Sequence, residues 1–178
     1  MKESAMGKKN YIDDDAPEIP EYIREMMKTG EIADRIVLDR EGNWHHNGEP
    51  FTNKKIIDFF NKSVNISIDG HFVLHYSNYT YPIEVEDVAV FITGVRFEGF
   101  GSFERVIMNL TTGQTDELDP DTLYYRQNNA LYCSVLGGKF QARFMRSPSF
   151  HILDRLDEIE GSFYLTICGK RIKLEKRK

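Results

Sequence analysis

The stretch IIDFFNKSVNISIDGHFVLHYSNYTYPIEVE, residues 56–86, decides the fold because it joins a short apolar helix to a hairpin. Ile56, Phe59 and Phe60 recur at the spacing of a helix that buries one face. Residues 72–76 instead alternate between the two faces of a strand, with phenylalanine, leucine and tyrosine on one of them. The stretch therefore predicts a helix followed by an antiparallel hairpin, and its core positions are apolar.

The same order of elements returns near the C-terminus. Residues 152–156 and 160–165 can be aligned with residues 56–60 and 69–74, and a hairpin with a glycine in its turn precedes each copy. A closing strand follows each copy, so the repeated unit is hairpin, helix, hairpin. The similarity predicts an internal duplication. A helix followed by a hairpin also recurs by chance, and the identities between the copies are few.

The whole pattern predicts an α+β fold of two small antiparallel-sheet domains. Residues 1–34 predict a polar tail and a helix that docks on the main body, and residues 35–110 predict the N-terminal α+β domain. Residues 111–178 predict the C-terminal α+β domain. The polar stretch 111–122 is the expected hinge between the two domains.

Composition indicates a soluble globular protein and excludes two classes of function. The chain has 178 residues, of which 40% are hydrophobic and 29% charged, and no apolar run approaches the roughly 20 residues of a membrane span. A net charge of −5 argues against bulk nucleic-acid binding, which needs a large positive face. Because the polar start lacks a signal-peptide core, we expect a cytoplasmic protein with no membrane partner. Cys133 and Cys168 lie in apolar runs and predict buried thiols.

Four histidines in the first half suggest a metal site, but their spacing argues against one. His71 and His75 share a strand face and lie about 13 Å apart, and the adjacent His45 and His46 point to opposite faces. We therefore predict no metal. The sequence also contains no nucleophile elbow and no phosphate-binding loop, so it predicts no catalytic residue and no cofactor.

The acidic residues that end the quoted stretch have more than one interpretation. Glu84 and Glu86 alternate with apolar residues, which is typical of the solvent side of a strand. Asp87 directly precedes the buried run 88–93, where a carboxylate needs a partner. Capping of a turn explains Asp87 best. Acid or base catalysis by Asp87, Glu86 and a histidine, as in a phosphoester hydrolase, is the weakest alternative.

Basic residues on the predicted strand 139–146 form the best candidate binding surface. Its arginines, with Arg126 upstream and Arg155 on the next helix, suit bidentate capture of a phosphate or carboxylate. The helix that residues 147–148 can open would add backbone donors, and Trp44 and several tyrosines would supply a stacking surface. A solvated basic strand beside core aromatics explains the same residues equally well.

Several short motifs resemble the bacterial domain-of-unknown-function family 1285 (DUF1285). They are IVLDREGNW at residues 36–44, GEP at 48–50, DG at 69–70, IEVED at 83–87 and FQARFMR at 140–146. The resemblance covers nearly all of the chain after about Pro17. It implies a two-domain α+β fold with a duplicated motif, a C-terminal half loosely similar to pleckstrin-homology folds, and a ligand site between the halves. It also implies a nucleotide-like ligand and a role in signal transduction.

The chain departs from this family pattern at two places. Thr52 and Asn53 stand where the family has a basic residue, and residues 88–90 replace an expected aromatic residue and proline. A ligand contact made by that basic residue in relatives would here be missing, or would move to Lys54 or Lys55.

From the sequence we predict a non-enzymatic binding or sensory protein that holds a small anionic, nucleotide-like ligand in the cleft between two domains. The second hypothesis is a protein-interaction module that offers a sheet edge or a helix groove to a partner. The residues expected to line the ligand cleft are Trp44, Glu86, Asp87, Arg143 and Arg146.

Overall fold

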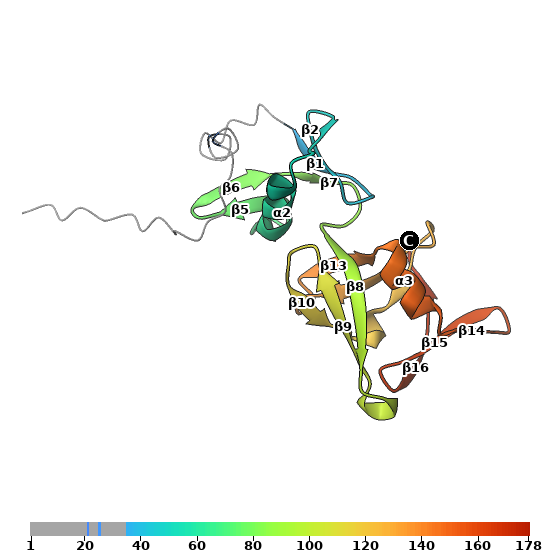
Figure 1. The fold of residues 1–178 in the computed structure, drawn as a ribbon. Helices are drawn as coiled ribbons and strands as arrows, with labels where there is room; N and C mark the ends of the chain where they lie inside the picture. The colour runs from blue at the N-terminus through green and yellow to red at the C-terminus, as the bar shows by residue number, and fades with distance from the viewer. Residues whose placement is uncertain (1–20, 22–24, 26–34) are drawn as a thin grey trace, which may run out of the picture.

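The computed structural model describes residues 35–178, together with Glu21 and Glu25. Apart from these two glutamates, the tail and docking helix expected over residues 1–34 lie outside the described residues. The described part combines helices α2 and α3 with four β-sheets (Figure 1), so the predicted α+β class is confirmed. Among these residues, no helix has both the length and the apolarity to cross a membrane.

The N-terminal part, residues 35–87, consists of two small sheets around one helix. The first sheet has the strand order β3-β2-β1-β7, and the second is the meander β4-β5-β6. The bounds are β1 Ile36–Leu38, β2 Trp44–His46, β3 Glu49–Pro50, α2 Lys54–Ser63, β4 Val64–Ile66, β5 Phe72–Tyr76, β6 Tyr79–Pro82 and β7 Glu84–Val85.

Helix α2 is capped by Asn53, and its buried face is the one that the sequence predicts. The side chain of Asn53 accepts a hydrogen bond of 3.0 Å from the backbone N–H of Lys55, which satisfies one of the free donors at the start of the helix. Ile56, Phe59 and Phe60 are at most 4% exposed. They form the stripe that joins α2 to the core.

The C-terminal part, residues 88–178, is built on a seven-stranded sheet of order β10-β9-β8-β13-β12-β11-β17. Helix α3 packs against β8 and β13 and leads into a second meander, β14-β15-β16. The bounds are β8 Val90–Glu98, η1 Gly101–Phe103, β9 Arg105–Leu110, β10 Thr115–Glu117, η2 Pro120–Thr122, β11 Tyr124–Tyr125, β12 Leu131–Val135, β13 Phe140–Phe144, α3 Arg146–Leu153, β14 Leu156–Ile159, β15 Ser162–Ile167, β16 Lys170–Lys173 and β17 Glu175–Lys176.

The seven-stranded sheet crosses the boundary that the sequence predicts between residues 110 and 111. Strand β9 pairs with β10 directly across it, and the N–H of Gly113 donates to the carbonyl of Leu110 at 3.0 Å in a tight turn. The stretch 111–122 therefore consists of a turn, β10 and η2, and it does not separate one sheet from another. Turns and linkers share the same polar, glycine-containing composition. The chain instead passes from one sheet to the next between β7 and β8 (Figure 1). The division into two domains stays a prediction.

Two segments of the chain run through the same series of strand pairings. Strand β7 pairs in parallel with β1, and β17 pairs in parallel with β11. The N–H of Ile83 donates to the carbonyl of Phe72 at 3.1 Å, and the N–H of Leu174 donates to that of Phe163 at 2.9 Å. The order hairpin, helix, meander, closing strand thus occurs from β1 to β7 and again from β11 to β17.

Replacing the cap of α2 tests this local explanation. We expect Asn53→Ala to lower the free energy of unfolding by about 1 kcal/mol, because the N–H of Lys55 loses its acceptor. Urea denaturation measures the change. Asn53→Ser is the matched control, since serine also caps helices; a loss in the control as large as in the alanine variant would contradict the capping role.

Candidate functional site

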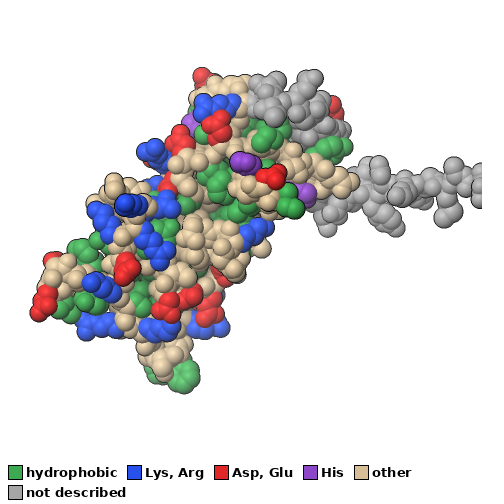
Figure 2. All heavy atoms as spheres, turned by 180° about the vertical axis from the view of Figure 1, so that it is seen from behind, with side chains coloured by type: hydrophobic (Ala, Val, Ile, Leu, Met, Phe, Trp, Pro, Cys, Tyr) green, Lys and Arg blue, Asp and Glu red, His purple; other side chains and the backbone are tan. Residues whose placement is uncertain are grey.

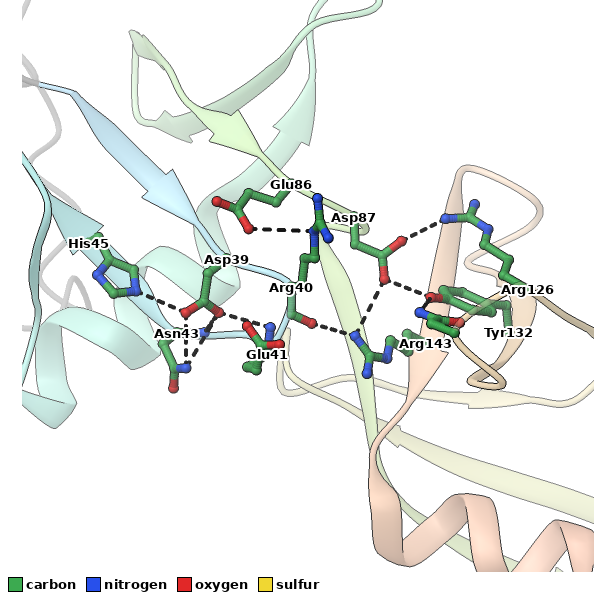
Figure 3. A network of polar contacts seen from close by, with 11 residues as sticks. Asp39, Arg40, Glu41, Asn43, His45, Glu86, Asp87, Arg126, Tyr132 and Arg143 are labelled. Carbon is green, nitrogen blue, oxygen red and sulfur yellow. Dashed lines mark hydrogen bonds and ion pairs between the residues drawn. The ribbon is translucent and has the colours of Figure 1, made fainter. Parts of the chain in front are cut away.

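The carboxylate of Asp87 is the centre of a polar cluster between the two parts of the chain (Figure 3). The side chain of Asp87 is only 9% exposed. It accepts hydrogen bonds from Nη1 of Arg126 at 2.6 Å and from the hydroxyl of Tyr132 at 2.8 Å. Nη1 of Arg143 lies 3.6 Å away. Two cations and a phenol therefore compensate one nearly buried negative charge.

Strand pairing brings these residues together from distant positions. Asp87 lies in the link between β7 and β8, and Arg126 begins the turn that follows β11. Tyr132 on β12 and Arg143 on β13 face each other as direct antiparallel partners. The sheet register therefore fixes which side chains reach Asp87.

The donors to Asp87 are themselves held in place. The guanidinium of Arg126 lies 4.4 Å from the centre of the Tyr132 ring, and the side-chain amide of Asn128 donates to the Tyr132 hydroxyl at 2.8 Å. Burial raises the pKa of Tyr132, the bond from Asn128 acts against this, and the carboxylate of Asp87 adds to the increase. The phenol therefore stays protonated and donates to Asp87. Nε of Arg126 is buried with no hydrogen-bond partner among the described residues.

The loop 39–43 connects the N-terminal part to this cluster. Arg143 donates from Nη1 to the carbonyl of Arg40 at 2.6 Å, and Nε of Arg40 lies 3.8 Å from the carboxylate of Glu86 (Figure 3). A Cβ at Gly42, where φ is +88°, would lie 3.2 Å from the ring of Phe91 on β8. Only glycine fits this close approach with that backbone conformation.

Asp39 holds the loop in shape. Its carboxylate accepts hydrogen bonds from the backbone N–H groups of Asn43 at 2.7 Å and Glu41 at 3.0 Å, and Nε2 of His45 lies 2.9 Å away. Burial acts to raise the pKa of Asp39, but these hydrogen bonds outweigh it and leave the pKa below its ordinary value. The ionised carboxylate therefore presents the Arg40 carbonyl to Arg143.

A pocket of about 320 Å³ opens beside Asp87. Its lining includes three cationic side chains, two carboxylates and two amides. One of the carboxylates, that of Asp87, is already paired with Arg126. The lining residues are Arg40, Glu86, Asp87, Arg126, Gln127, Asn128 and Lys178.

The structure brings together three of the five residues that the sequence predicts for the ligand cleft. Glu86 and Asp87 line the pocket, and Arg143 contacts Asp87 from the sheet. Trp44 is 1% exposed and donates from its indole N–H to Asn61 at 2.8 Å, so it belongs to the core. Arg146 lies at the start of α3, with its guanidinium over the Phe150 ring at 5.6 Å, and is absent from the cluster.

Four pocket residues carry no signal in the sequence. Arg40, Gln127 and Asn128 lie in hairpin turns, where polar residues are ordinary, and Lys178 lies in a basic tail. The need of Asp87 for a partner is visible in the sequence. Its partners are not, because Arg126 and Tyr132 are separated from it by 39 and 45 positions.

Groups suited to metal or thiol chemistry do not gather in the described part of the chain. No three histidine, cysteine, aspartate or glutamate side chains there are placed to hold a metal ion. Both cysteines are free, and burial raises the pKa of Cys133 to about 12. The thiol of Cys133 is therefore not a ready nucleophile.

The fold and the cluster define an α+β protein with a polar site where two sheet systems meet. No protein-family model and no curated protein matches the chain. A DUF1285 family protein from Silicibacter pomeroyi DSS-3 superposes with a TM-score of 0.63, covering 78% of each chain at 18% identity. A DUF1285 family protein from Shewanella baltica OS155 does so with a TM-score of 0.52, covering 68% of this chain and 92% of that one at 15% identity. The chain therefore has a DUF1285-like fold, as its motifs predict.

Removing the central charge tests the role of Asp87. We expect Asp87→Asn to lower the free energy of unfolding by about 2–3 kcal/mol, because Arg126 and Arg143 lose their counter-charge. Tyr132→Phe should cost less, about 1–2 kcal/mol, since it removes the hydrogen bonds of the hydroxyl to Asp87 and from Asn128 but keeps the ion pairs. Urea denaturation of both variants measures the difference; an Asp87→Asn variant as stable as the wild type would contradict this role.

Proposed function

We propose that the protein is a non-enzymatic binding protein that holds a small anionic, nucleotide-like ligand in the pocket beside Asp87. The observation that carries the proposal is the surplus of positive charge in the pocket. Arg40, Arg126 and Lys178 line it against Glu86 and Asp87. Arginine side chains suit phosphate and carboxylate groups because their N–H donors match two oxygens at once.

Arg40 and Lys178 carry this surplus of positive charge. Asp87 forms ion pairs with Arg126 and Arg143, whereas the only ion pair of Arg40 within the described part of the chain is the long contact to Glu86 at 3.8 Å. Arg40 is 70% exposed, so its guanidinium can reorient toward a ligand. No ion pair joins Lys178 to another described residue. These two cations are the expected ligand contacts.

Ligand binding there supports a role in signal transduction. Arg40 and Glu86 come from the N-terminal part and Arg126 and Lys178 from the C-terminal part. A ligand that contacts both parts stabilises the arrangement of the two parts that it binds most tightly. The size of this shift is set by the difference in its affinity for the alternative arrangements.

Two finer features of the fold belong to the same proposal. The matching strand pairings of β1–β7 and β11–β17 support an internal duplication. The likeness of the C-terminal half to pleckstrin-homology folds stays a prediction. A phosphoester hydrolase finds less support, because both oxygens of the Asp87 carboxylate already accept structural hydrogen bonds, one from Arg126 and the other from Tyr132.

Thermal unfolding against a panel of mononucleotides, pyrophosphate and dicarboxylates tests the proposed site. A true ligand at a hundredfold excess over its Kd should stabilise the protein by about 2.7 kcal/mol. Arg40→Ala and Lys178→Ala should each weaken the binding of that ligand. Arg96→Ala is the matched control, because it removes an exposed arginine that pairs with Glu98 outside the pocket. If no compound stabilises the wild type, or if the control loses as much affinity, the proposed function is wrong.

One observation favours a protein-interaction module as a second candidate. The turn between β8 and β9 exposes Phe100 at 84% and Phe103 at 82%. Figure 2 shows apolar side chains at the lower end of the molecule, where Figure 1 places this hairpin tip. Two exposed phenylalanines on one turn make an apolar knob that suits an apolar pocket of a partner.

The apolar knob formed by Phe100 and Phe103 is held by polar contacts of Glu104 and by the packing of a neighbouring turn. The carboxylate of Glu104 is 12% exposed and accepts from Arg155 at 2.6 Å and from the N–H of Cys168 at 2.8 Å. A Cβ on Gly169 would lie 2.6 Å from Cα of Ser102, so the β15–β16 turn packs tightly against the tip. The phenylalanines are therefore presented on a rigid support, which lowers the entropy cost of docking.

The double variant Phe100→Ser/Phe103→Ser tests this second candidate. Its stability should stay within about 0.5 kcal/mol of wild type, because both rings are exposed. A partner purified with the wild-type chain should bind the variant at least about tenfold more weakly in direct titration. Phe150→Ser, at an exposed ring on α3, is the control; equal binding by all forms would contradict the tip as the docking surface.

A further inference from the structure

A second pocket, of about 330 Å³, shares no lining residue with the pocket beside Asp87. It is formed where the β14–β15 turn, the end of β16 and β17 meet β11. The lining combines two lysines, a serine, two aromatic residues and one carboxylate. The lining residues are Tyr125, Gly161, Ser162, Phe163, Lys173, Leu174, Glu175 and Lys176.

The two lysines of this pocket differ from the other basic residues of the same hairpin. Lys170 pairs with Asp121 at 2.7 Å, and Arg171 lies 3.7 Å from Asp157. Within the described part of the chain, the side chains of Lys173 and Lys176 have neither a hydrogen bond nor an ion pair. Their positive charge is therefore left for a ligand, with only Glu175 in the lining to oppose it.

The fold does not require lysines at these two positions. Pro82 in the N-terminal part occupies the position that corresponds to Lys173. Pro82 pairs with Val73, and Lys173 pairs in the same way with Tyr164. Val85 pairs with Leu38 in the parallel pair that corresponds to Lys176 and Tyr125. The same backbone frame thus forms with uncharged residues, so the lysines are free to serve a role other than folding.

The aromatic side chains give the pocket an apolar wall beside its charges. Tyr125 and Phe163 meet nearly edge to face, with their ring centres 6.4 Å apart, and both are partly exposed. Ser162 lies in the same lining. Lysines, a hydroxyl and ring surfaces together suit a ligand that carries an anionic group next to a flat ring.

We infer that this pocket is a second binding site, separate from the Asp87 pocket, for a small organic anion that carries an aromatic ring. The ammonium groups of Lys173 and Lys176 hold the anionic group, and Tyr125 and Phe163 contact the ring. A phosphate monoester of an aromatic alcohol has this chemistry. Inorganic phosphate supplies the anion alone, and phenol supplies the ring alone.

The test is a titration of the full chain with phenyl phosphate, followed by the backbone amide signals of Gly161 and Ser162 in NMR spectra. We expect phenyl phosphate to shift these signals and to bind more tightly than inorganic phosphate or phenol. The variant Lys173→Thr/Lys176→Val should weaken binding by about tenfold or more. Valine is the residue that the N-terminal part carries at the position of Lys176, so this variant is expected to fold.

The matched control is Lys170→Thr/Arg171→Thr, which removes the same two charges from the same hairpin outside the pocket. Its affinity should stay within about twofold of wild type. An equal loss of affinity in both double variants would mean that general charge attraction holds the ligand, and it would overturn the inference. The absence of any shift of the Gly161 and Ser162 signals up to about 10 mM phenyl phosphate would also overturn it. Arg40→Ala should leave these shifts unchanged; if it removes them, the ligand occupies the Asp87 pocket and the inference is wrong.

Discussion

The burial of one carboxylate, that of Asp87, governs how the two parts of the chain meet. A charge that is only 9% exposed is costly unless cations and hydrogen-bond donors surround it. Arg126, Tyr132 and Arg143 supply them from the turn after β11 and from strands β12 and β13. Strands β11, β12 and β13 are neighbours in one sheet, so the three partners of Asp87 lie close together at one place on that sheet. The link from β7 to β8 must bring Asp87 to this place, and the C-terminal sheet therefore fixes the position of the link.

Arg143 extends this constraint into the N-terminal part. It lies beside Asp87 and also donates to the carbonyl of Arg40, whose loop Asp39 holds in shape. Arg143 is thus a structural residue, although its position on a basic strand suggests a ligand contact. The cations that remain for a ligand are Arg40 and Lys178, which lie at the rim of the pocket and take no part in satisfying Asp87.

The sequence predicts the local elements well and the long-range pairings poorly, for a physical reason. Helix α2 and the hairpin β5-β6 follow from periodicity within one segment, and so does the burial of residues 88–92. The parallel pairing of β8 with β13 joins residues about fifty positions apart, and no local pattern encodes it. For the same reason the sequence shows that Asp87 needs a partner but not that Arg126 is that partner. Trp44 is core because alternation in β2 points its ring inward, toward Phe60.

The matching frames of the two parts explain how one pocket acquires opposite charges. The N–H of Glu86 donates to the carbonyl of Leu38 at 3.0 Å, and the N–H of Arg177 donates to that of Tyr125 at 2.8 Å. Asp87 and Lys178, the next residues in each case, therefore leave equivalent closing strands, and both line the same pocket. The strand pairing fixes the position of the residue that follows each closing strand, and the identity of that residue determines the charge at this position. After β7 this residue is Asp87, a nearly buried anion that joins the two parts. After β17 it is Lys178, an exposed cation that is available to a ligand.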